Sequence, residues 1–384
     1  MGIVGKENRN LRYGRFCSEA GYQQSWPPKS DMLKFLEEDQ LFPLADNIYW
    51  LSIHNAMVAS IPDVQHPVYG VPQNVDELIR IEMLHNVIGW QAQLENTRLE
   101  RFKVSGCLFW ALNDLWPTTS WSMINWYGTC KNHYYAFKKA AAPLQAIASQ
   151  QHQILLPGEA YDLEVCLVND FLTEQKDLQV VASIYLGEKA NKVYRKEFVG
   201  SVGPNAVDCL GRLDWAIPQN TNEHNFILIL EVKNQLGEIV AKNEYVCQIG
   251  EVKKDGDTIE RVSASDGFFG EYRLWEKNVI QPKLLNLPST LPAGTEKAFE
   301  IQYTNNTTNI IMGLETLITN LPKGVRLYLD DNYIHLLPGQ QRTIKASLQN
   351  TTRSNINDQL SLKLQSDALN IELATQTIHL DCSN

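Results

Sequence analysis

Apolar residues recur with a helical period in the first third of the chain. Asn74 and Glu77 form a capping-box-like start, and the apolar residues that follow lie on roughly one helical face: Leu78, Ile81, Leu84, Ile88, Ala92 and Leu99. The mostly apolar run at 104–112 is typical of a strand buried on both faces, as in a parallel sheet.

Three shorter signals complete this region. They predict a strand at 12–18, a short helix capped by Ser30, and a helix at 132–142 that ends at Pro143. The order of strand, helices, strand and helix predicts an α/β domain over residues 1–145.

After residue 145 the period changes to two, which indicates strands. Alternating apolar positions occur at 161–167, 180–186 and 226–232, and they predict a β-sandwich over residues 146–250. The polar stretch at 251–270 is rich in Lys, Asp, Gly and Ser, and we interpret it as a linker. Alternation resumes at 299–303, 344–348 and 360–364, so a second sandwich is predicted over 271–384.

Composition narrows the class of protein. A chain of 384 residues with 44% hydrophobic and 20% charged residues is expected to form two or three globular domains. No apolar run is long enough for a membrane span, and residues 1–15 lack the apolar core of a signal peptide. The net charge of -10, without a basic cluster, makes nucleic acid an unfavourable partner.

Metal and cofactor motifs are not evident. The seven cysteines are widely spread with no CxxC pair, so buried free thiols are favoured over a disulfide framework or a zinc site. HExxH, GxGxxG, Walker and GxSxG motifs do not occur. We therefore expect no cofactor and no metal.

Two segments combine acidic, amide and aromatic residues directly after a predicted buried strand. They are R-F-C-S-E-A-G-Y-Q-Q-S-W-P at 15–27, and F-W-A-L-N-D-L-W-P at 109–117 followed by S-W-S-M-I-N-W-Y-G at 120–128. In a (β/α)8 barrel, the carboxyl ends of the strands build the active site. A carboxylate at Glu19 with indole rings nearby suits a sugar, but a surface glutamate and core tryptophans account for the same pattern.

These segments resemble the nucleophile-strand and eighth-strand motifs of the β-mannosidase branch of glycoside hydrolase family 2. Their order and spacing match, as does the intervening helix with Gln91, Glu95 and Arg98. The resemblance implies a multidomain α/β plus all-β protein: the C-terminal part of a (β/α)8 TIM barrel over 1–145, followed by two immunoglobulin-like β-sandwiches.

The resemblance also implies roles for individual residues. Glu19 would be the catalytic nucleophile, and Trp110 would form the floor of the sugar subsite. Four further residues would line or brace the pocket: Tyr22, Asn113, Asp114 and Trp121. Two features depart from the family pattern: Ala20 stands where a bulky aromatic is common, and one alignment places an extra glutamine between Tyr22 and Ser25.

A retaining glycosidase needs a second carboxyl group as general acid/base. The family supplies it from an Asn-Glu motif in an N-terminal part that this sequence lacks. Asp114 is a weak substitute because it follows the wrong strand. We therefore expect this chain alone to be inactive; a split reading frame, an arbitrary boundary, or a separate polypeptide that supplies the N-terminal part would each explain its length.

Two alternatives remain open for function. One is a sister specificity, β-glucosaminidase or β-galactosidase; the other is a non-catalytic carbohydrate-binding or scaffold protein. The compartment also stays open, although Asn305, Asn306 and Asn350 each begin an N-x-T triplet.

Overall fold

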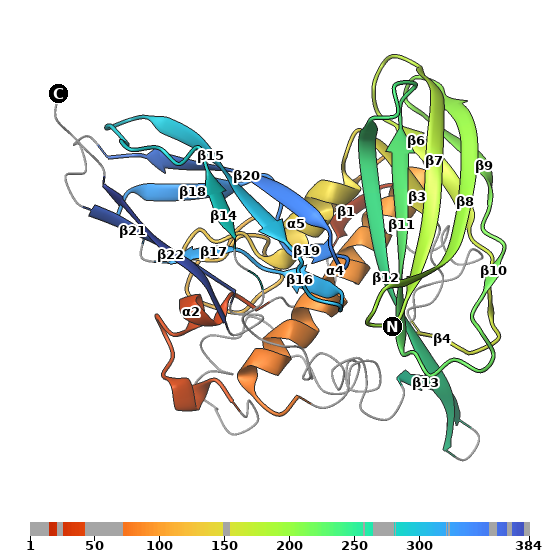
Figure 1. Ribbon diagram of the computed structural model, residues 1–384, viewed down its shortest axis with the longest axis horizontal. Helices are drawn as coiled ribbons and strands as arrows, with labels where there is room; N and C mark the ends of the chain where they lie inside the picture. Colours follow the sequence, from red (N-terminus) through yellow and green to blue (C-terminus); the bar gives the residue numbers. More distant parts are fainter. Residues whose placement is uncertain are drawn as a thin grey trace. The chain divides into compact units, whose positions relative to one another are not determined.

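The structure is a computed structural model. It describes residues 15–20, 26–42, 72–148, 154–255, 258–263, 280, 282–319, 321, 323–352, 359–366 and 371–379. Within these ranges no helix has the length and hydropathy that a membrane span requires. The molecule is mostly β, and it divides into two compact units that are described separately below (Figure 1).

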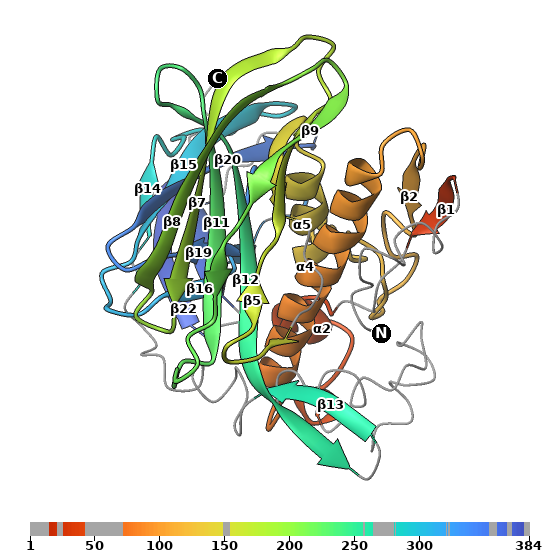
Figure 2. The ribbon, with the colours of Figure 1, turned by 90° about the vertical axis from the view of Figure 1, so that its right-hand side faces the viewer.

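The first unit contains a small parallel sheet. Strand β1 (Cys17–Ala20) pairs in parallel with β2 (Cys107–Phe109), and helix α5 (Asn132–Ala140) follows β2 in the chain. Figure 2 shows β1 beside β2. Strand β2 is shorter than the strand predicted at 104–112. Strand β1 overlaps the strand predicted at 12–18 at residues 17–18 and extends to Ala20, and residues 12–14 lie outside the described residues. The α/β pattern predicted for this region is present as parallel strands with helices between and after them.

Helix α4 (Val75–Leu99) is the longest helix of the described residues. It begins as predicted: the backbone N–H of Glu77 donates to Asn74 Oδ1 over 2.9 Å, and Asn74 Nδ2 donates to the Glu77 carboxylate over 3.4 Å. Residues 74–80 belong to the second unit and the remainder to the first. In the first unit, Trp90 is buried and its ring stacks on His133 of α5 with 5.5 Å between ring centroids.

A β-sandwich forms much of the described part of the first unit. One sheet has the order β3-β6-β9, and the other has the order β13-β12-β11-β7-β8 with β4 beside β12. The strands are β3 (Leu144–Ala148), β4 (Ile154–Leu155), β6 (Glu164–Asn169), β7 (Gln175–Leu186), β8 (Asn191–Val202), β9 (Ala206–Arg212), β11 (Asn225–Lys233), β12 (Ile239–Asp255) and β13 (Thr258–Ser263). A two-stranded sheet joins β5 (Ala160–Tyr161) to β10 (Trp215–Ala216).

The core of this sandwich lies between its sheets. The predicted alternation holds: Val180 and Ile184 of β7 are fully buried with Leu228 and Leu230 of β11 and with Val165 of the opposite sheet. Alternate residues face one side of a strand, so a period of two in the sequence builds a continuous apolar layer.

The linker expected at 251–270 is wrong for residues 251–263. Strand β12 continues to Asp255 and pairs with β13 from Gly250–Ser263 to Asp255–Thr258. Arg261 fixes this hairpin to the sandwich, because its guanidinium donates to Ile154 O over 3.1 Å and to the Glu159 carboxylate over 2.7 Å. Two residues, Gly256 and Asp257, separate the strands, and Gly-Asp between short alternating runs is itself a hairpin signal.

One cysteine pair corrects the expectation of free thiols. Cys166 of β6 and Cys209 of β9 form a disulfide. They are register partners on neighbouring strands although 43 residues separate them in sequence. Pairing of distant strands is a tertiary property, so cysteine spacing in the sequence did not reveal it.

Helix α4 is attached to the sandwich by two polar clusters. The first surrounds the buried carboxyl group of Glu95, which accepts hydrogen bonds from Asn243 Nδ2 (2.8 Å), Tyr245 Oη (2.9 Å) and Gln91 Nε2 (3.1 Å). Burial raises the pKa of Glu95 to about 7, while these donors and Arg98 lower it. The cluster spans α4 and β12, so the helix and the sheet share one buried polar network.

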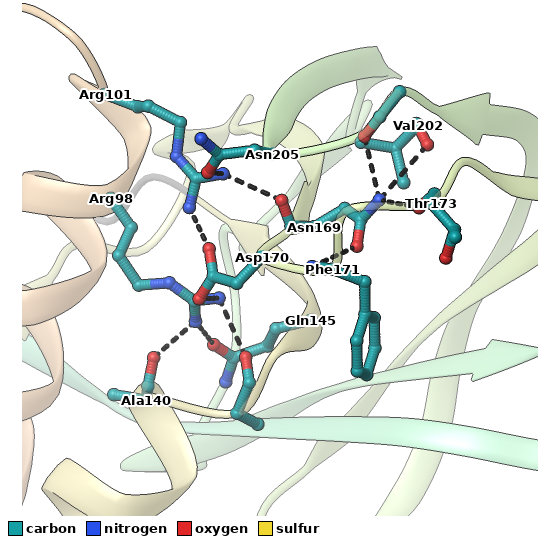
Figure 3. Close-up of polar contacts among 12 residues, drawn as sticks. Arg98, Arg101, Ala140, Gln145, Asn169, Asp170, Phe171, Thr173, Val202 and Asn205 are labelled. Atoms are coloured by element: carbon teal, nitrogen blue, oxygen red, sulfur yellow. Dashed lines mark hydrogen bonds and ion pairs between the residues drawn. The ribbon is translucent and has the colours of Figure 1, made fainter.

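The second cluster centres on Arg98 and Asp170 (Figure 3). The Arg98 guanidinium donates to Ala140 O (2.5 Å), Gln145 Oε1 (2.9 Å) and Asp170 Oδ2 (2.9 Å). Arg101 pairs with the other oxygen of Asp170. Because Ala140 is the last residue of α5, Arg98 satisfies a carbonyl group at that helix end and joins it to the sandwich.

The second unit is a smaller β structure. Its sheets have the orders β14-β15-β20-β18, β16-β19 and β17-β21-β22. The elements are α2 (Lys29–Met32), the 3-10 helix η2 (Glu38–Gln40), β14 (Lys283–Leu285), β15 (Glu296–Thr304), β16 (Ile311–Leu314), β17 (Leu317–Thr319), β18 (Val325–Leu329), β19 (Ile334–Leu336), β20 (Gln341–Asn350), β21 (Gln359–Ser366) and β22 (Ile371–His379). Phe299, Ile301, Ile344 and Leu348 are buried in its own core, as the alternation predicted.

Candidate functional site

Two sequence-predicted residues, Glu19 and Trp110, lie at the carboxyl ends of neighbouring parallel strands. The register joins Cys17 to Cys107 and Ala20 to Phe109, and the backbone N–H of Trp110 donates to Ala20 O over 2.9 Å. Between these pairs β1 has one residue more than β2. An extra residue of this kind bends a strand and re-aims its side chains, and here the side chain of Glu19 is exposed while Ala20 is buried.

Trp110 directly follows β2 and presents an exposed aromatic surface. Its side chain is 54% exposed, and the peptide bond between Trp110 and Ala111 is cis. Trp116 and Trp126 of the following segment are 43% and 52% exposed. An exposed indole offers an apolar face to a sugar ring, and the carboxylate offers hydrogen-bond acceptors to its hydroxyls.

Asp114 lies below the surface. It is the acceptor of the Ser120 and Ser122 hydroxyl groups, and its second oxygen is 3.5 Å from Lys131 Nζ. Both members of the ion pair are buried, and burial lowers the pKa of Lys131 to about 8 against the raising effect of Asp114. This geometry makes Asp114 a brace of the segment 110–131, with only 1% of its side chain exposed.

The remaining predicted site residues differ in exposure. Asn113 is exposed and donates to Asp114 O over 3.0 Å, whereas Trp121 is half-buried. The Trp121 carbonyl oxygen is 3.2 Å from His133 Nε2, and burial lowers the pKa of His133 to about 3, so this imidazole is neutral. Tyr22 lies outside the described residues.

Backbone hydrogen bonds fold the segment 110–131 on itself. Met123 donates to Ala111 O over 3.1 Å, Ile124 donates to Leu112 O over 2.8 Å, and Lys131 donates to Met123 O over 2.9 Å. The residues that precede α5 are therefore hydrogen-bonded to the backbone that directly follows Trp110.

Metal-ligand spacing occurs once among the described residues, at Glu164, Cys166 and Cys209. The two sulfur atoms are bonded to each other, and metal binding by cysteine requires thiolates. This group does not fit a metal, and it lies in the sandwich, on different strands from Glu19 and Trp110.

Sequence reasoning missed Lys131 and His133, two buried side chains that hydrogen-bond to backbone carbonyl groups of the segment 110–131. A lysine next to a predicted helix gives no sign that it will be buried, because lysine is almost always exposed. Their spacing gives no signal either, because residues two apart do not share a helix face.

Comparisons with known proteins give consistent relatives. The Ig_mannosidase family, an Ig-fold domain, matches residues 295–368. The β-mannosidase of Capra hircus is 28% identical over 169 residues, which is 40% of this chain and 19% of the goat protein. β-Mannosidase B of Aspergillus niger is 25% identical over 187 residues, 44% of this chain and 20% of the fungal protein.

Solved structures share the fold. The Amycolatopsis orientalis exo-chitosanase CsxA superposes with a TM-score of 0.69 at 17% identity, over 95% of this chain and 42% of that one. The β-D-mannosidase of Dictyoglomus thermophilum gives a TM-score of 0.62 at 18% identity, over 94% and 38%. This chain thus spans less than half of the proteins that it matches. The resemblance indicated by the sequence motifs is confirmed: the chain is similar to the C-terminal portion of β-mannosidase-like enzymes of glycoside hydrolase family 2.

Proposed function

We propose that this chain is the C-terminal portion of a retaining exo-β-glycosidase of the β-mannosidase type. In this proposal β1 and β2 are the last two strands of a (β/α)8 barrel, and the sandwiches at 146–263 and 271–384 are immunoglobulin-like domains. The observation that carries it is that Glu19 and Trp110 both have exposed side chains and both lie at the carboxyl ends of adjacent parallel strands.

The proposed chemistry assigns covalent catalysis to Glu19. Its carboxylate would attack the anomeric carbon of a terminal β-linked sugar and form a glycosyl-enzyme, which water then hydrolyses with retention of configuration. Trp110 would hold the sugar ring at its apolar face, and Asn113 would hydrogen-bond a hydroxyl group. Asp114 would keep the supporting segment in place.

The second carboxyl group is expected from outside the described residues. Retention requires an acid/base about 5 to 5.5 Å from the nucleophile. Asp114 does not suit this role, because its buried oxygens already face two hydroxyl groups and an ammonium group. We propose that the group comes from the part of the barrel that the relatives contain and that their alignment with this chain does not cover.

A chimera tests the nucleophile assignment. The N-terminal part of the goat β-mannosidase, up to the position that aligns with Arg15, is joined to residues 15–384 of this chain. We expect turnover of an aryl β-mannoside by the chimera, and a loss on the order of 10⁴-fold or more with Glu19→Gln, because the amide has no charge with which to attack. Glu174→Gln, which changes an exposed carboxylate of the sandwich, should leave turnover unchanged.

Covalent trapping locates the nucleophile directly. An activated 2-fluoro-mannoside should label Glu19, as peptide mass mapping would show. Label on Asp114 or on another acid, or near-normal turnover by Glu19→Gln, would remove the basis of the proposal. A panel of β-glucosaminide and β-galactoside substrates distinguishes the sister specificities.

Trp110 should affect binding as well as turnover. In the same chimera Trp110→Ala deletes the surface on which substrate and transition state both rest, so we expect affinity for a mannose-type inhibitor to fall roughly 10-fold or more. Trp126→Ala is the matched control, because Trp126 has nearly the same exposure on the same segment. Equal losses for both variants would indicate a general effect of lost aromatic surface.

A further inference from the structure

Two free cysteines face each other across the small parallel sheet. Cys17 of β1 and Cys107 of β2 are register partners, and neither is in a disulfide. Cys17 is buried and Cys107 is half-buried. Cys17 precedes Glu19 by two residues, and Cys107 precedes Trp110 by three. The two cysteines are therefore the first residues of the strands that lead to the candidate site.

Their arrangement meets the requirements of a disulfide. Neighbouring strands lie about 4.8 Å apart, and a disulfide joins residues whose Cα atoms are about 4.4 to 6.8 Å apart. Paired residues point to the same side of a sheet. Burial and the neighbouring Cys17 raise the pKa of the Cys107 thiol, while Thr97 of α4 lowers it, so alkaline pH favours the thiolate that attacks.

The other cysteines of the described residues provide an internal comparison. Cys166 and Cys209 are register partners as well, and they are joined by a disulfide. Cys247 instead lies against the Tyr161 hydroxyl group at 3.4 Å, and Cys130 lies in the segment before α5. Among the free cysteines of the described ranges, Cys17 and Cys107 alone are strand partners.

We propose that Cys17 and Cys107 form a redox-active pair that oxidises to a disulfide joining β1 to β2. A low-molecular-weight disulfide such as oxidised glutathione serves as oxidant. The Cys107 thiolate attacks one of its sulfur atoms and releases one glutathione as a thiolate; the Cys17 thiolate then displaces the second, and the two cysteine protons pass through solvent to the two glutathione thiolates. Two electrons move from the protein thiols to the oxidant, and a dithiol reverses the reaction.

The consequence of oxidation is a fixed register between the two strands that carry Glu19 and Trp110. The disulfide closes a loop of about 90 residues, which restricts the unfolded chain and so stabilises the folded state. The inference does not depend on the proposed hydrolase activity, because the linkage itself is measured.

Mass spectrometry tests the pair in the full chain. The purified protein is incubated with oxidised glutathione at pH 8.5, alkylated with iodoacetamide and digested without reduction. We expect a peptide linking Cys17 to Cys107 to accumulate and to disappear after dithiothreitol, while Cys130 and Cys247 remain alkylated. Recovery of Cys17 and Cys107 as alkylated or glutathione-bound peptides, with the Cys166–Cys209 peptide intact, would overturn the proposal.

Matched variants separate pairing from general reactivity. Cys17→Ser should abolish the linked peptide and leave Cys107 as a stable glutathione adduct, whereas Cys130→Ser should leave the linked peptide unchanged. Oxidation of the unmodified chain should also raise Tm by roughly 5 °C, and Cys17→Ser should lose this shift. If Cys17→Ser does not fold, the linkage in the unmodified chain still decides between the outcomes.

Discussion

A single buried charge supports the segment that carries Trp110. Lys131 Nζ lies 3.5 Å from Asp114 and 3.1 Å from Ser120 O, and its side chain is fully buried. An unpaired buried ammonium group costs far more than a paired one, because protein cannot solvate it as water does. The ion pair is therefore needed to keep the segment 110–131 folded.

Removal of Asp114 should be costly for this reason. We expect Asp114→Ala to lower the free energy of unfolding by about 3 kcal/mol, measured by urea denaturation. Asp162→Ala is the matched control, because Asp162 pairs with Arg212 at the surface and both side chains are about half exposed; its loss should stay below about 1 kcal/mol. Equal losses for the two variants would show that Lys131 finds other partners.

The three N-x-T triplets differ in the environment of the asparagine amide nitrogen, the atom to which a glycan attaches. Asn305 Nδ2 donates to Asn309 O and Leu336 O, and Asn350 Nδ2 donates to Leu291 O; both side chains are buried. Asn306 is exposed. A glycan on the amide nitrogen of either buried asparagine would disrupt those hydrogen bonds.

Secretion from a eukaryotic host should therefore place a glycan on Asn306 alone. Peptide mapping after enzymatic glycan removal would identify the site, and Asn306→Gln should abolish glycosylation without changing Tm. Folded, secreted chain with a glycan on Asn350 would contradict this expectation.

At the scale of elements, helix α4 shows that a polar helical face does not by itself reveal whether it is exposed or buried. Gln91, Glu95 and Arg98 are spaced four and three residues apart, so they share one face of the helix. A polar stripe normally faces solvent. Here Glu95 and Arg98 are buried against β12, β3 and the loop at Asp170, because the sandwich supplies hydrogen-bond partners for each of them.

The Glu95 cluster should make stability depend on pH. Its folded-state pKa of about 7 lies above the ordinary value of 4.5, so the folded state binds more protons than the unfolded state between these values. The contribution of Glu95 to stability is therefore full below about pH 4.5 and is lost as pH rises through 7, by up to about 3 kcal/mol.

Glu95→Gln removes this titration. We expect the difference in unfolding free energy between pH 5 and pH 8 to become smaller in the variant, measured by urea denaturation at each pH. Glu159→Gln, which changes a partly buried contact with Arg261 of the hairpin, is the control and should keep the original slope. An unchanged slope in Glu95→Gln would assign the pH dependence to other groups.

Local sequence patterns predicted the positions of helices and strands better than they predicted which residues and elements contact each other. The capping box at Asn74, the period-two strands and the placement of Glu19 and Trp110 at the carboxyl ends of strands follow from short-range rules. The disulfide between Cys166 and Cys209 and the burial of Lys131 depend on which strands and loops meet. These contacts form between residues distant in sequence, or between residues whose type gives no signal of burial.

At the scale of the whole molecule, the second unit has a core of its own, whereas the two parts of the first unit depend on each other. The core of the second unit contains residues between 280 and 364 alone. In the first unit, Glu95 of α4 depends on Asn243 and Tyr245, and Arg98 depends on Gln145 and Asp170. The α/β part and the first sandwich therefore share their polar partners.

Fragments of the chain should reproduce this difference. We expect residues 275–384 to unfold cooperatively as a soluble fragment, whereas residues 1–145 should aggregate. Without the sandwich, the polar face of α4 has no hydrogen-bond partners, and the edges of the two-stranded sheet stay unpaired. Loss of the sandwich also exposes more apolar surface, in addition to side chains that are already exposed, such as Phe102, Leu108 and Leu115. Residues 1–263 provide the control, because they restore the partners of Glu95 and Arg98, and they should be more soluble than 1–145. Size-exclusion chromatography with light scattering and thermal denaturation would measure each fragment; a folded monomer of residues 1–145 would show that the α/β part does not need the sandwich.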